Sequence, residues 1–271
     1  MRTQKINFPD RQTPGVFPDK RSNLRQAISE LGLKGRYPVI VLIGGEIAQP
    51  QAAMTRQAIE TISRTAEDMN AVVICGGTDM GVMAEIGQIR SRQGYKFALV
   101  GVAPEALVTW SSGPRSTKFL WWGQQRWQLE SHYSHFILVP GSQFGDETAW
   151  ISDAAILLSK DNRSVTILIN GGEVSRKDIE LSLADGRPVI ALGGTGRLAN
   201  DLAIEPDRHH LLTVIPANAQ QRIVEAIQTA LSMTEKSSVP RFKIREKVTH
   251  GKYVIQNEMN TIKVPVSVTS R

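Results

Sequence analysis

The stretch VVICGGTDMGVMAEIG (72–87) joins an apolar, β-branched run to a Gly-Gly pair and then to residues with helical spacing. The same order recurs in VIVLIGGE (39–46), VTILINGGE (165–173) and VIALGGTGR (189–197). Each apolar run has the length of a strand, and each glycine pair precedes a predicted helix. Such repetition predicts a parallel sheet with four glycine-rich loops at its carboxyl edge, where open α/β sheets bind their ligands.

The rest of the chain extends this alternation. We predict seven strands, at 38–43, 71–74, 97–102, 135–139, 165–169, 189–192 and 211–214. Helices are predicted across 54–69, 81–93, 147–159, 176–184 and 219–233, with a short one from 197. Because the strands are almost continuously hydrophobic, helices should cover both sheet faces. The fold class is therefore α/β, a Rossmann-like, doubly wound parallel sheet of about seven strands.

Charge and composition divide the chain into three parts. Residues 1–37 hold eight Lys/Arg and three acids, and residues 236–271 hold eight and two, whereas 38–235 are net acidic. We expect a basic N-terminal extension over 1–37, with 1–18 extended or disordered and a helix over 20–33. The predicted α/β domain spans 38–235. A basic C-terminal tail, 236–271, should form one or two strands with a turn near 257–260.

Composition also limits location and partners. No apolar run approaches the roughly 20 residues of a membrane span. The N-terminus lacks the apolar core of a signal peptide. A lone cysteine, Cys75, fits a reducing cytoplasm and a buried position in a strand. No Cys/His cluster has metal-ligand spacing, so we expect no metal. The basic ends are either solvated or contact a partner, but without a nucleic-acid motif we do not expect nucleic acid.

Two of the glycine loops are the best phosphate candidates. In the first, Gly76, Gly77 and Gly81 allow close approach, Thr78 can cap a helix or bind a phosphate oxygen, and Val82 follows at the helix start. In the second, Gly194, Thr195 and Gly196 would present N–H groups. Arg197 stands at a helix start, where the dipole disfavours a cation. It would pair with a phosphate or carboxylate of the ligand, or with Asp201.

Acidic residues follow the other loops. Glu46 comes after Gly44 and Gly45, and Glu173 after Gly171 and Gly172. These acids can accept bonds from ribose hydroxyls or cap helices. Ser175 with Asp178 resembles an N-cap pattern.

The segment VPGSQFGDETAW (139–150) follows another strand and contains Gly141, Glu147 and Thr148. Glu147 is the candidate catalytic residue: it can hold a ribose, act as a general acid or base, or only cap the helix.

A Trp-rich segment, 117–136, carries Lys118, Trp121, Trp122, Arg126 and Trp127. It can be a lid that stacks on a nucleobase, a subunit contact or simple packing. His132 and His135 lie three residues apart without a third ligand, and His135 is expected to be structural.

Taken in order, the motifs GGE, GGTDMGVMAEI, GVAPE, SHFILV, GDETAWI, LINGGEVSRKDI and GRPVIALGGTGRLAND resemble those of prokaryotic SLOG domains related to the N-terminal domains of TRPM channels. The resemblance spans about 38–233. It implies a Rossmann-like fold that binds ADP-ribose, cyclic ADP-ribose, NAD or a related nucleotide across the glycine loops. It also implies a homo-oligomer, a dimer or larger.

The wider superfamily includes the cytokinin-activating phosphoribohydrolases. Their first loop resembles residues 76–83, whereas their second is only echoed by 140–148, where Gly-Asp-Glu replaces a Gly-Thr step. We therefore expect a stand-alone nucleotide sensor or carrier that needs no further cofactor. The alternative is an enzyme that cleaves an N-glycosidic bond, with Glu147 as acid/base and Arg197 as phosphate anchor.

Overall fold

A computed structural model describes residues 1–47, 49–111, 126–205, 209–232, 255–257 and 260–262. Contacts divide the chain into two compact units, Met1–Glu235 and Lys236–Arg271. In the described residues of the second unit, β12 (Ile255–Asn257) pairs antiparallel with β13 (Asn260–Ile262). This hairpin lies where the sequence predicted one or two strands with a turn near 257–260.

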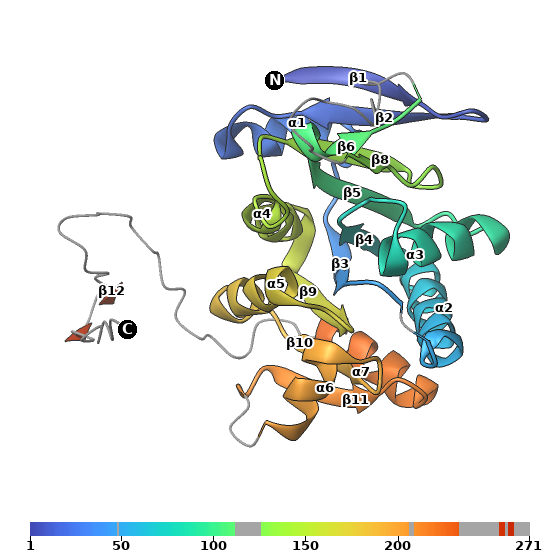
Figure 1. The fold of residues 1–271 in the computed structure, drawn as a ribbon. Coiled ribbons are helices and arrows are strands. Elements are labelled where there is room, and N and C mark those ends of the chain that lie inside the picture. Colours follow the sequence, from blue (N-terminus) through green and yellow to red (C-terminus); the bar gives the residue numbers. More distant parts are fainter. Residues whose placement is uncertain (48, 112–125, 206–208, 233–254, 258–259, 263–271) are drawn as a thin grey trace, which may run out of the picture. The chain divides into compact units, whose positions relative to one another are not determined.

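Nine strands of the described chain form one sheet in the first unit (Figure 1). Their order is β1-β2-β8-β5-β4-β3-β9-β10-β11, and every neighbouring pair is parallel except β1 with β2. The strands are β1 (Arg2–Asn7), β2 (Gln12–Phe17), β3 (Tyr37–Gly44), β4 (Val72–Cys75), β5 (Ala98–Pro104), β8 (His135–Val139), β9 (Ser159–Ile169), β10 (Val189–Gly193) and β11 (Leu212–Pro216). All seven predicted strands are confirmed.

Helices cover both faces of this sheet. One face carries α2 (Ala52–Asp68), α3 (Gly81–Arg92) and α7 (Gln220–Ser232). The other carries α1 (Leu24–Glu30), α4 (Thr148–Leu158), α5 (Glu173–Ala184) and α6 (Arg197–Ile204). Short elements are the 3-10 turns η1 (Arg21–Asn23) and η2 (Glu105–Leu107), and β6 (Val108–Thr109) paired with β7 (Trp127–Gln128). No helix in the described ranges is both long and apolar enough to cross a membrane.

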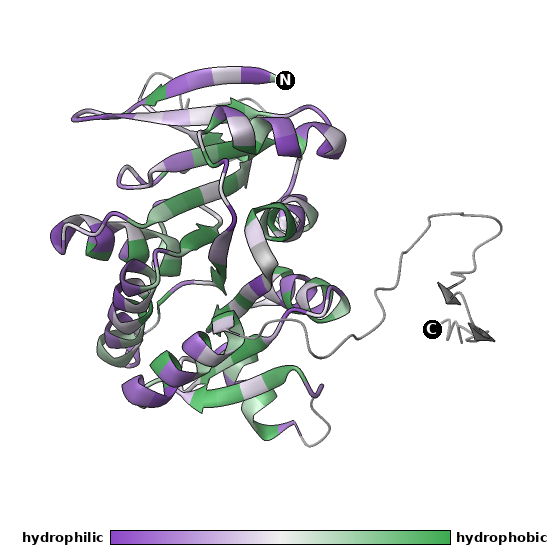
Figure 2. Ribbon diagram, turned by 180° about the vertical axis from the view of Figure 1, so that it is seen from behind, coloured by the Kyte–Doolittle hydropathy of each residue, from purple (hydrophilic) through white to green (hydrophobic). Residues whose placement is uncertain are grey.

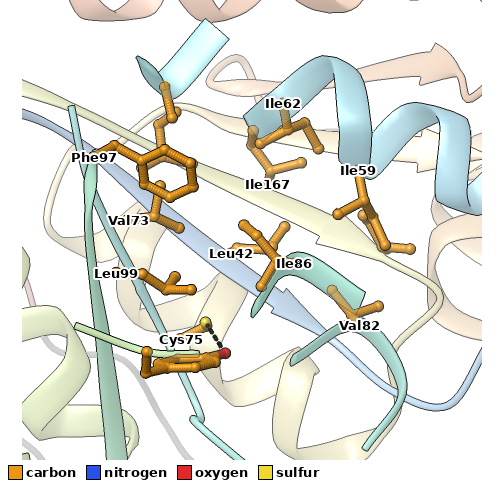
Figure 3. Packing of buried hydrophobic residues seen from close by; sticks show 14 of the residues in the cluster. Leu42, Ile59, Ile62, Val73, Cys75, Val82, Ile86, Phe97, Leu99 and Ile167 are labelled. Carbon is orange, nitrogen blue, oxygen red and sulfur yellow. Dashed lines mark hydrogen bonds between the residues drawn. The ribbon is translucent and has the colours of Figure 1, made fainter. Parts of the chain in front are cut away.

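The core explains why the strands are so evenly apolar. In β3, Ile40 and Leu42 pack toward α2 and α3, while Val39 and Val41 pack toward α4. Figure 3 shows Leu42 among residues of α2 and α3 such as Ile59 and Ile86. Since successive side chains of a strand point to opposite faces, burial of both faces requires apolar residues at every position. The central strands are accordingly hydrophobic in Figure 2. Cys75 is buried in this core, as predicted, and its sulfur lies 2.8 Å from the Tyr133 hydroxyl.

The N-terminus differs from the prediction. Residues 1–18 do not form an extension apart from the domain, because β1 and β2 join the sheet beside β8. Ile6, Phe8, Val16 and Phe17 are buried there. The apolar residues of 1–18 come in short groups among polar residues and three prolines. A sequence pattern that short does not reveal an edge hairpin, whose pairing depends on the edge of β8.

The chain order creates a topological switch point. From β3 the chain adds β4, β5 and β8 on one side, and α4 then leads back to β9 on the other side of β3. The helix after β3 (α2) and the helix after β9 (α5) consequently cover opposite faces. Loops that leave adjacent strands toward opposite faces open a crevice at the carboxyl edge.

Candidate ligand-binding site

Asn170 connects three loops at the carboxyl edge. It follows β9 with a left-handed φ of 60°, which asparagine tolerates better than most residues. Its Nδ2 donates to the Glu46 carbonyl oxygen (2.8 Å), and its backbone N–H donates to the Thr195 hydroxyl (2.8 Å). The Ala199 N–H donates to the Asn170 carbonyl oxygen (3.0 Å). The loops after β3, β9 and β10 are therefore held together by one residue that the sequence analysis did not single out.

Arg197 places a cation on this crevice. The residue begins α6 with a left-handed φ of 41°, an uncommon and strained conformation for arginine. Its Nη2 lies 2.7 Å from the position that a Cβ on Gly172 would occupy, and its Nη1 lies 3.9 Å from that of Gly45. Among the described residues no carboxylate forms an ion pair with Arg197, so the alternative pairing with Asp201 is not observed.

The loops after β3 and β9 meet beneath this guanidinium. Gly45 is the open position, since a Cβ there would have the Gly171 nitrogen, at 3.8 Å, as its nearest contact. Gly44 and Gly171 are instead required by packing, against the Ile169 carbonyl oxygen and the Leu168 side chain respectively. Glu46 and Glu173 are both exposed at this edge. The structure thus brings the two Gly-Gly-Glu loops together with Arg197.

The loop after β10 uses most of its polar groups internally. The N–H groups of Gly194 and Gly196 both donate to Asn200 Oδ1, at 2.8 and 3.2 Å. The buried Thr195 hydroxyl donates to the Leu192 carbonyl oxygen (2.7 Å). The N–H groups of Gly194 and Gly196 therefore already have partners within the loop, and what it presents to the crevice is the side chain of Arg197.

The other predicted phosphate loop, which runs from Gly76 to Val82 after β4, is closely packed. A Cβ on Gly77 would lie 2.8 Å from the Gly101 Cα, and one on Gly81 would lie 2.2 Å from the Gly45 carbonyl oxygen. The Thr78 side chain is buried, its backbone bridges to Leu129, and α3 has Met80 as its N-cap. The predicted helix cap at Thr78 is therefore wrong.

Other parts of this loop serve the fold as well. Val82 is completely buried, and its N–H donates to the Gly45 carbonyl oxygen (3.1 Å). Gly76 remains open, because a Cβ there would contact only the Met83 side chain, at 3.7 Å. The sequence does not predict the packing of this loop on the loop after β3, because the pairing of β3 with β4 in the sheet brings the two loops together.

The loop between β8 and α4 is held by its own acids. Gly141 packs beside Asp146, whose carboxylate accepts the N–H groups of Ser142 and Gln143 at 2.8 and 3.2 Å. Glu147 is only 6% exposed, and its carboxylate accepts the Gly145 N–H (2.7 Å). The loop is therefore ordered before any ligand arrives.

Two buried carboxyl groups lie where α4 and α5 begin. Burial, with a smaller contribution from the nearby charge of Asp178, raises the pKa of Glu147 to about 7. Burial likewise raises the pKa of Asp178 to about 6. Thr148 is buried as well, and its hydroxyl acts on the Asp178 carboxyl in the opposite direction to burial, lowering that pKa. The predicted cap at Ser175 is wrong, because α5 already begins at Glu173 and buries both Ser175 and Asp178.

The histidines have separate environments. His132 Nδ1 lies 2.5 Å from a Glu130 carboxylate oxygen, and His135 Nδ1 lies 2.8 Å from the Ser134 hydroxyl. Burial, then the charge of Arg90, lowers the pKa of His135 to about 4. The described residues contain no group of three or more His, Cys, Asp or Glu that could hold a metal ion. Of the Trp-rich segment, Lys118, Trp121 and Trp122 lie outside the described residues.

Two clefts lie away from the carboxyl edge. One, of about 230 Å³, lies between α5 and α6 and is lined by residues that include Ile179, Leu198 and Leu202. The other, of about 380 Å³, lies between α2 and α7. Neither is lined by Arg197 or by the glycine loops.

The fold and its crevice define an α/β protein of the Rossmann-like class, with its candidate site at the switch point of the sheet. A family model described as "SLOG in TRPM, prokaryote" matches residues 37–236, and the chain belongs to this family. Membership supports a nucleotide-related binding role.

Two solved structures are similar to this chain. One is the X-ray structure of TM1055, a structural genomics target, with 20% identity, 70% of this chain and 98% of that chain covered, and a TM-score of 0.49. The other is the molybdenum cofactor carrier protein of Chlamydomonas reinhardtii, with 19% identity, 73% and 100% covered, and a TM-score of 0.49. The comparison with curated proteins gives no match.

Proposed function

We propose that this protein is a sensor or carrier of a phosphate-bearing nucleotide of the ADP-ribose or NAD type, bound in the crevice between β3 and β9. The observation that carries the proposal is the guanidinium of Arg197, which has no carboxylate partner in the described chain and lies over two glycine loops. An unpaired arginine held in a strained backbone conformation is a common feature of ligand sites.

The neighbouring groups suit the two halves of a ribose phosphate. A phosphate over Gly45 would meet Arg197 and the N-terminal end of α5, whose N-cap Gly172 supplies no side-chain cap. Asn170 is 3% exposed, and its Oδ1 has no partner among the described residues, so it can accept a ribose hydroxyl. The exposed carboxylates of Glu46 and Glu173 can accept the others.

Calorimetry and thermal unfolding with ADP-ribose, cyclic ADP-ribose, NAD and AMP test this proposal. At 100 times its Kd, a bound nucleotide should stabilise the protein by about 2.7 kcal/mol. Arg197→Gly should weaken binding at least tenfold, since the phosphate loses its counter-ion. The free energy of unfolding should stay level or rise by roughly 1 kcal/mol, because glycine relieves the left-handed strain.

Arg222→Ala, at an exposed cation on α7, is the matched control and should bind like the wild type. Failure of all four nucleotides to bind at millimolar concentration would refute the proposal. Equal binding by Arg197→Gly and Arg222→Ala would remove Arg197 from the site.

A second candidate function is cleavage of an N-glycosidic bond. It is favoured by the Glu147 carboxyl, whose burial raises its pKa to about 7, a suitable value for a general acid at neutral pH. Release of free base from AMP or NAD, abolished in Glu147→Gln, would support this function. Tight binding without turnover would leave the sensor or carrier role alone.

A further inference from the structure

Two aromatic rings meet at the carboxyl edge, apart from the main core. The rings of Trp127 and Phe144 have centroids 6.5 Å apart and planes inclined at 60°. Trp127 is partly exposed, and Phe144 is 39% exposed. Both rings therefore offer apolar surface that another flat group can cover.

Backbone hydrogen bonds hold the segments that carry both rings. Trp127 belongs to β7, where it pairs with Val108 of β6, and the next residue's carbonyl oxygen accepts the Asp79 N–H (2.8 Å). Phe144 lies between residues whose N–H groups are bound by carboxylates, Gln143 by Asp146 and Gly145 by Glu147. A ring held outward by such a loop loses little conformational entropy when a ligand stacks on it.

The aromatic pair lies close to the cation of the crevice. A Cβ on Gly145, next to Phe144, would be 3.6 Å from Val174 in the first turn of α5. Two residues earlier, Gly172 packs against the Arg197 guanidinium. The loop that carries Phe144 and the Arg197 guanidinium thus both contact the start of α5. A ligand with a flat ring at one end and a phosphate at the other matches this arrangement.

We infer that Trp127 and Phe144 form a stacking subsite for the heteroaromatic base of the nucleotide whose phosphate meets Arg197. The inference rests on the proposed function. Aromatic side chains stack on any base through its π face, so the pair supplies affinity without selecting one base by hydrogen bonds. The chemical class bound here is a purine, pyrimidine or similar ring joined to a sugar phosphate.

The test compares AMP with ribose 5-phosphate, which keeps the sugar and phosphate but lacks the base. By calorimetry, Phe144→Ala should weaken AMP about tenfold and leave ribose 5-phosphate within twofold of the wild type. Phe144→Trp keeps an aromatic ring at this position, so it should bind AMP like the wild type and more tightly than Phe144→Ala. Ile204→Ala, at an 84% exposed apolar residue of α6, is the control and should change neither ligand. AMP should also quench tryptophan fluorescence in the wild type, and less so in Trp127→Phe.

The outcomes separate the subsite from the proposed function. If the wild type binds both ligands with equal affinity, or if Phe144→Ala weakens both alike, the stacking subsite is wrong while phosphate binding stands. If Phe144→Ala binds AMP like the wild type, the subsite is likewise wrong. If the wild type binds neither ligand, nor any nucleotide, the proposed function fails and the subsite fails with it.

Discussion

Single glycines in this protein have two different purposes. Gly81 has a left-handed φ of 48°, and a Cβ there would lie 2.2 Å from the Gly45 carbonyl oxygen, so the fold requires this glycine. Gly45 has room for a methyl group, and its φ is not in the left-handed region. Because packing does not demand a glycine at position 45, its absent side chain is better explained by a ligand that approaches the backbone.

Alanine substitutions should separate these purposes. Gly45→Ala should change the free energy of unfolding by less than about 0.5 kcal/mol yet weaken nucleotide binding at least tenfold. Gly81→Ala should cost about 3 kcal/mol or more, since both clash and backbone strain act. Gly94→Ala, with φ 68° and nothing within 4 Å, isolates the strain and should cost roughly 1 kcal/mol. Urea unfolding and calorimetry measure both quantities. Unchanged binding in Gly45→Ala would move the ligand away from this loop.

At the level of elements, two buried carboxyl groups lie where α4 and α5 begin. Glu147 precedes α4 and Asp178 lies within α5, and both have pKa values raised by burial. For a carboxyl whose pKa is higher in the folded state, the folded protein binds more protons than the unfolded one. Folding stability therefore falls as the pH rises from the unfolded pKa, about 4.5, through the folded pKa, about 7.

Glu147→Gln should remove this pH dependence, because glutamine keeps an acceptor for the Gly145 N–H but carries no charge. Between pH 5 and pH 8 the variant should gain roughly 3 kcal/mol relative to the wild type. Urea unfolding at several pH values measures the difference. Glu105→Gln, at an exposed acid paired with Arg2, is the control and should show no comparable trend. A constant difference between Glu147→Gln and wild type across this range would contradict the raised pKa.

At the scale of the whole molecule, the N-terminal residues belong to the unit that holds the sheet. The N-terminal strands contribute Ile6, Phe8, Val16 and Phe17 to the buried core and cover the edge of β8. The last 36 residues, Lys236–Arg271, form their own contact unit. The first segment is therefore part of the domain, although both ends share the same basic composition.

Truncations should show this difference. Removal of residues 1–18 deletes four buried apolar side chains and uncovers the core residues beneath them. Each lost side chain is worth about 1.5–3 kcal/mol, so the sum is comparable to the whole stability of a domain. We expect aggregation or loss of cooperative unfolding. A chain ending at Glu235 should unfold within a few degrees of the full-length protein. Calorimetric scans and light scattering provide the measurement, and cooperative unfolding without residues 1–18 would contradict the assignment.

The sequence was most informative where periodicity is local. Seven strands and their helices followed from apolar runs and glycine pairs, because burial of both sheet faces leaves few polar positions inside a strand, such as Thr166 in β9. The Gly-Gly-Glu loops and Arg197 were also identified in this way. The edge hairpin, the start of α5 and the burial of Thr78 were not predicted, since each depends on contacts with residues distant in the chain.

The sequence by itself determined the fold class, the carboxyl-edge position of the glycine loops and the family. Only the tertiary structure decided which loops meet. Strand order placed β9 beside β3, so the two Gly-Gly-Glu loops face each other at the switch point, with Arg197 over them. The same packing leaves no space around Gly77 and Gly81. The room in a loop depends on which loops lie beside it in the sheet, and the sequence shows only which residues are adjacent along the chain.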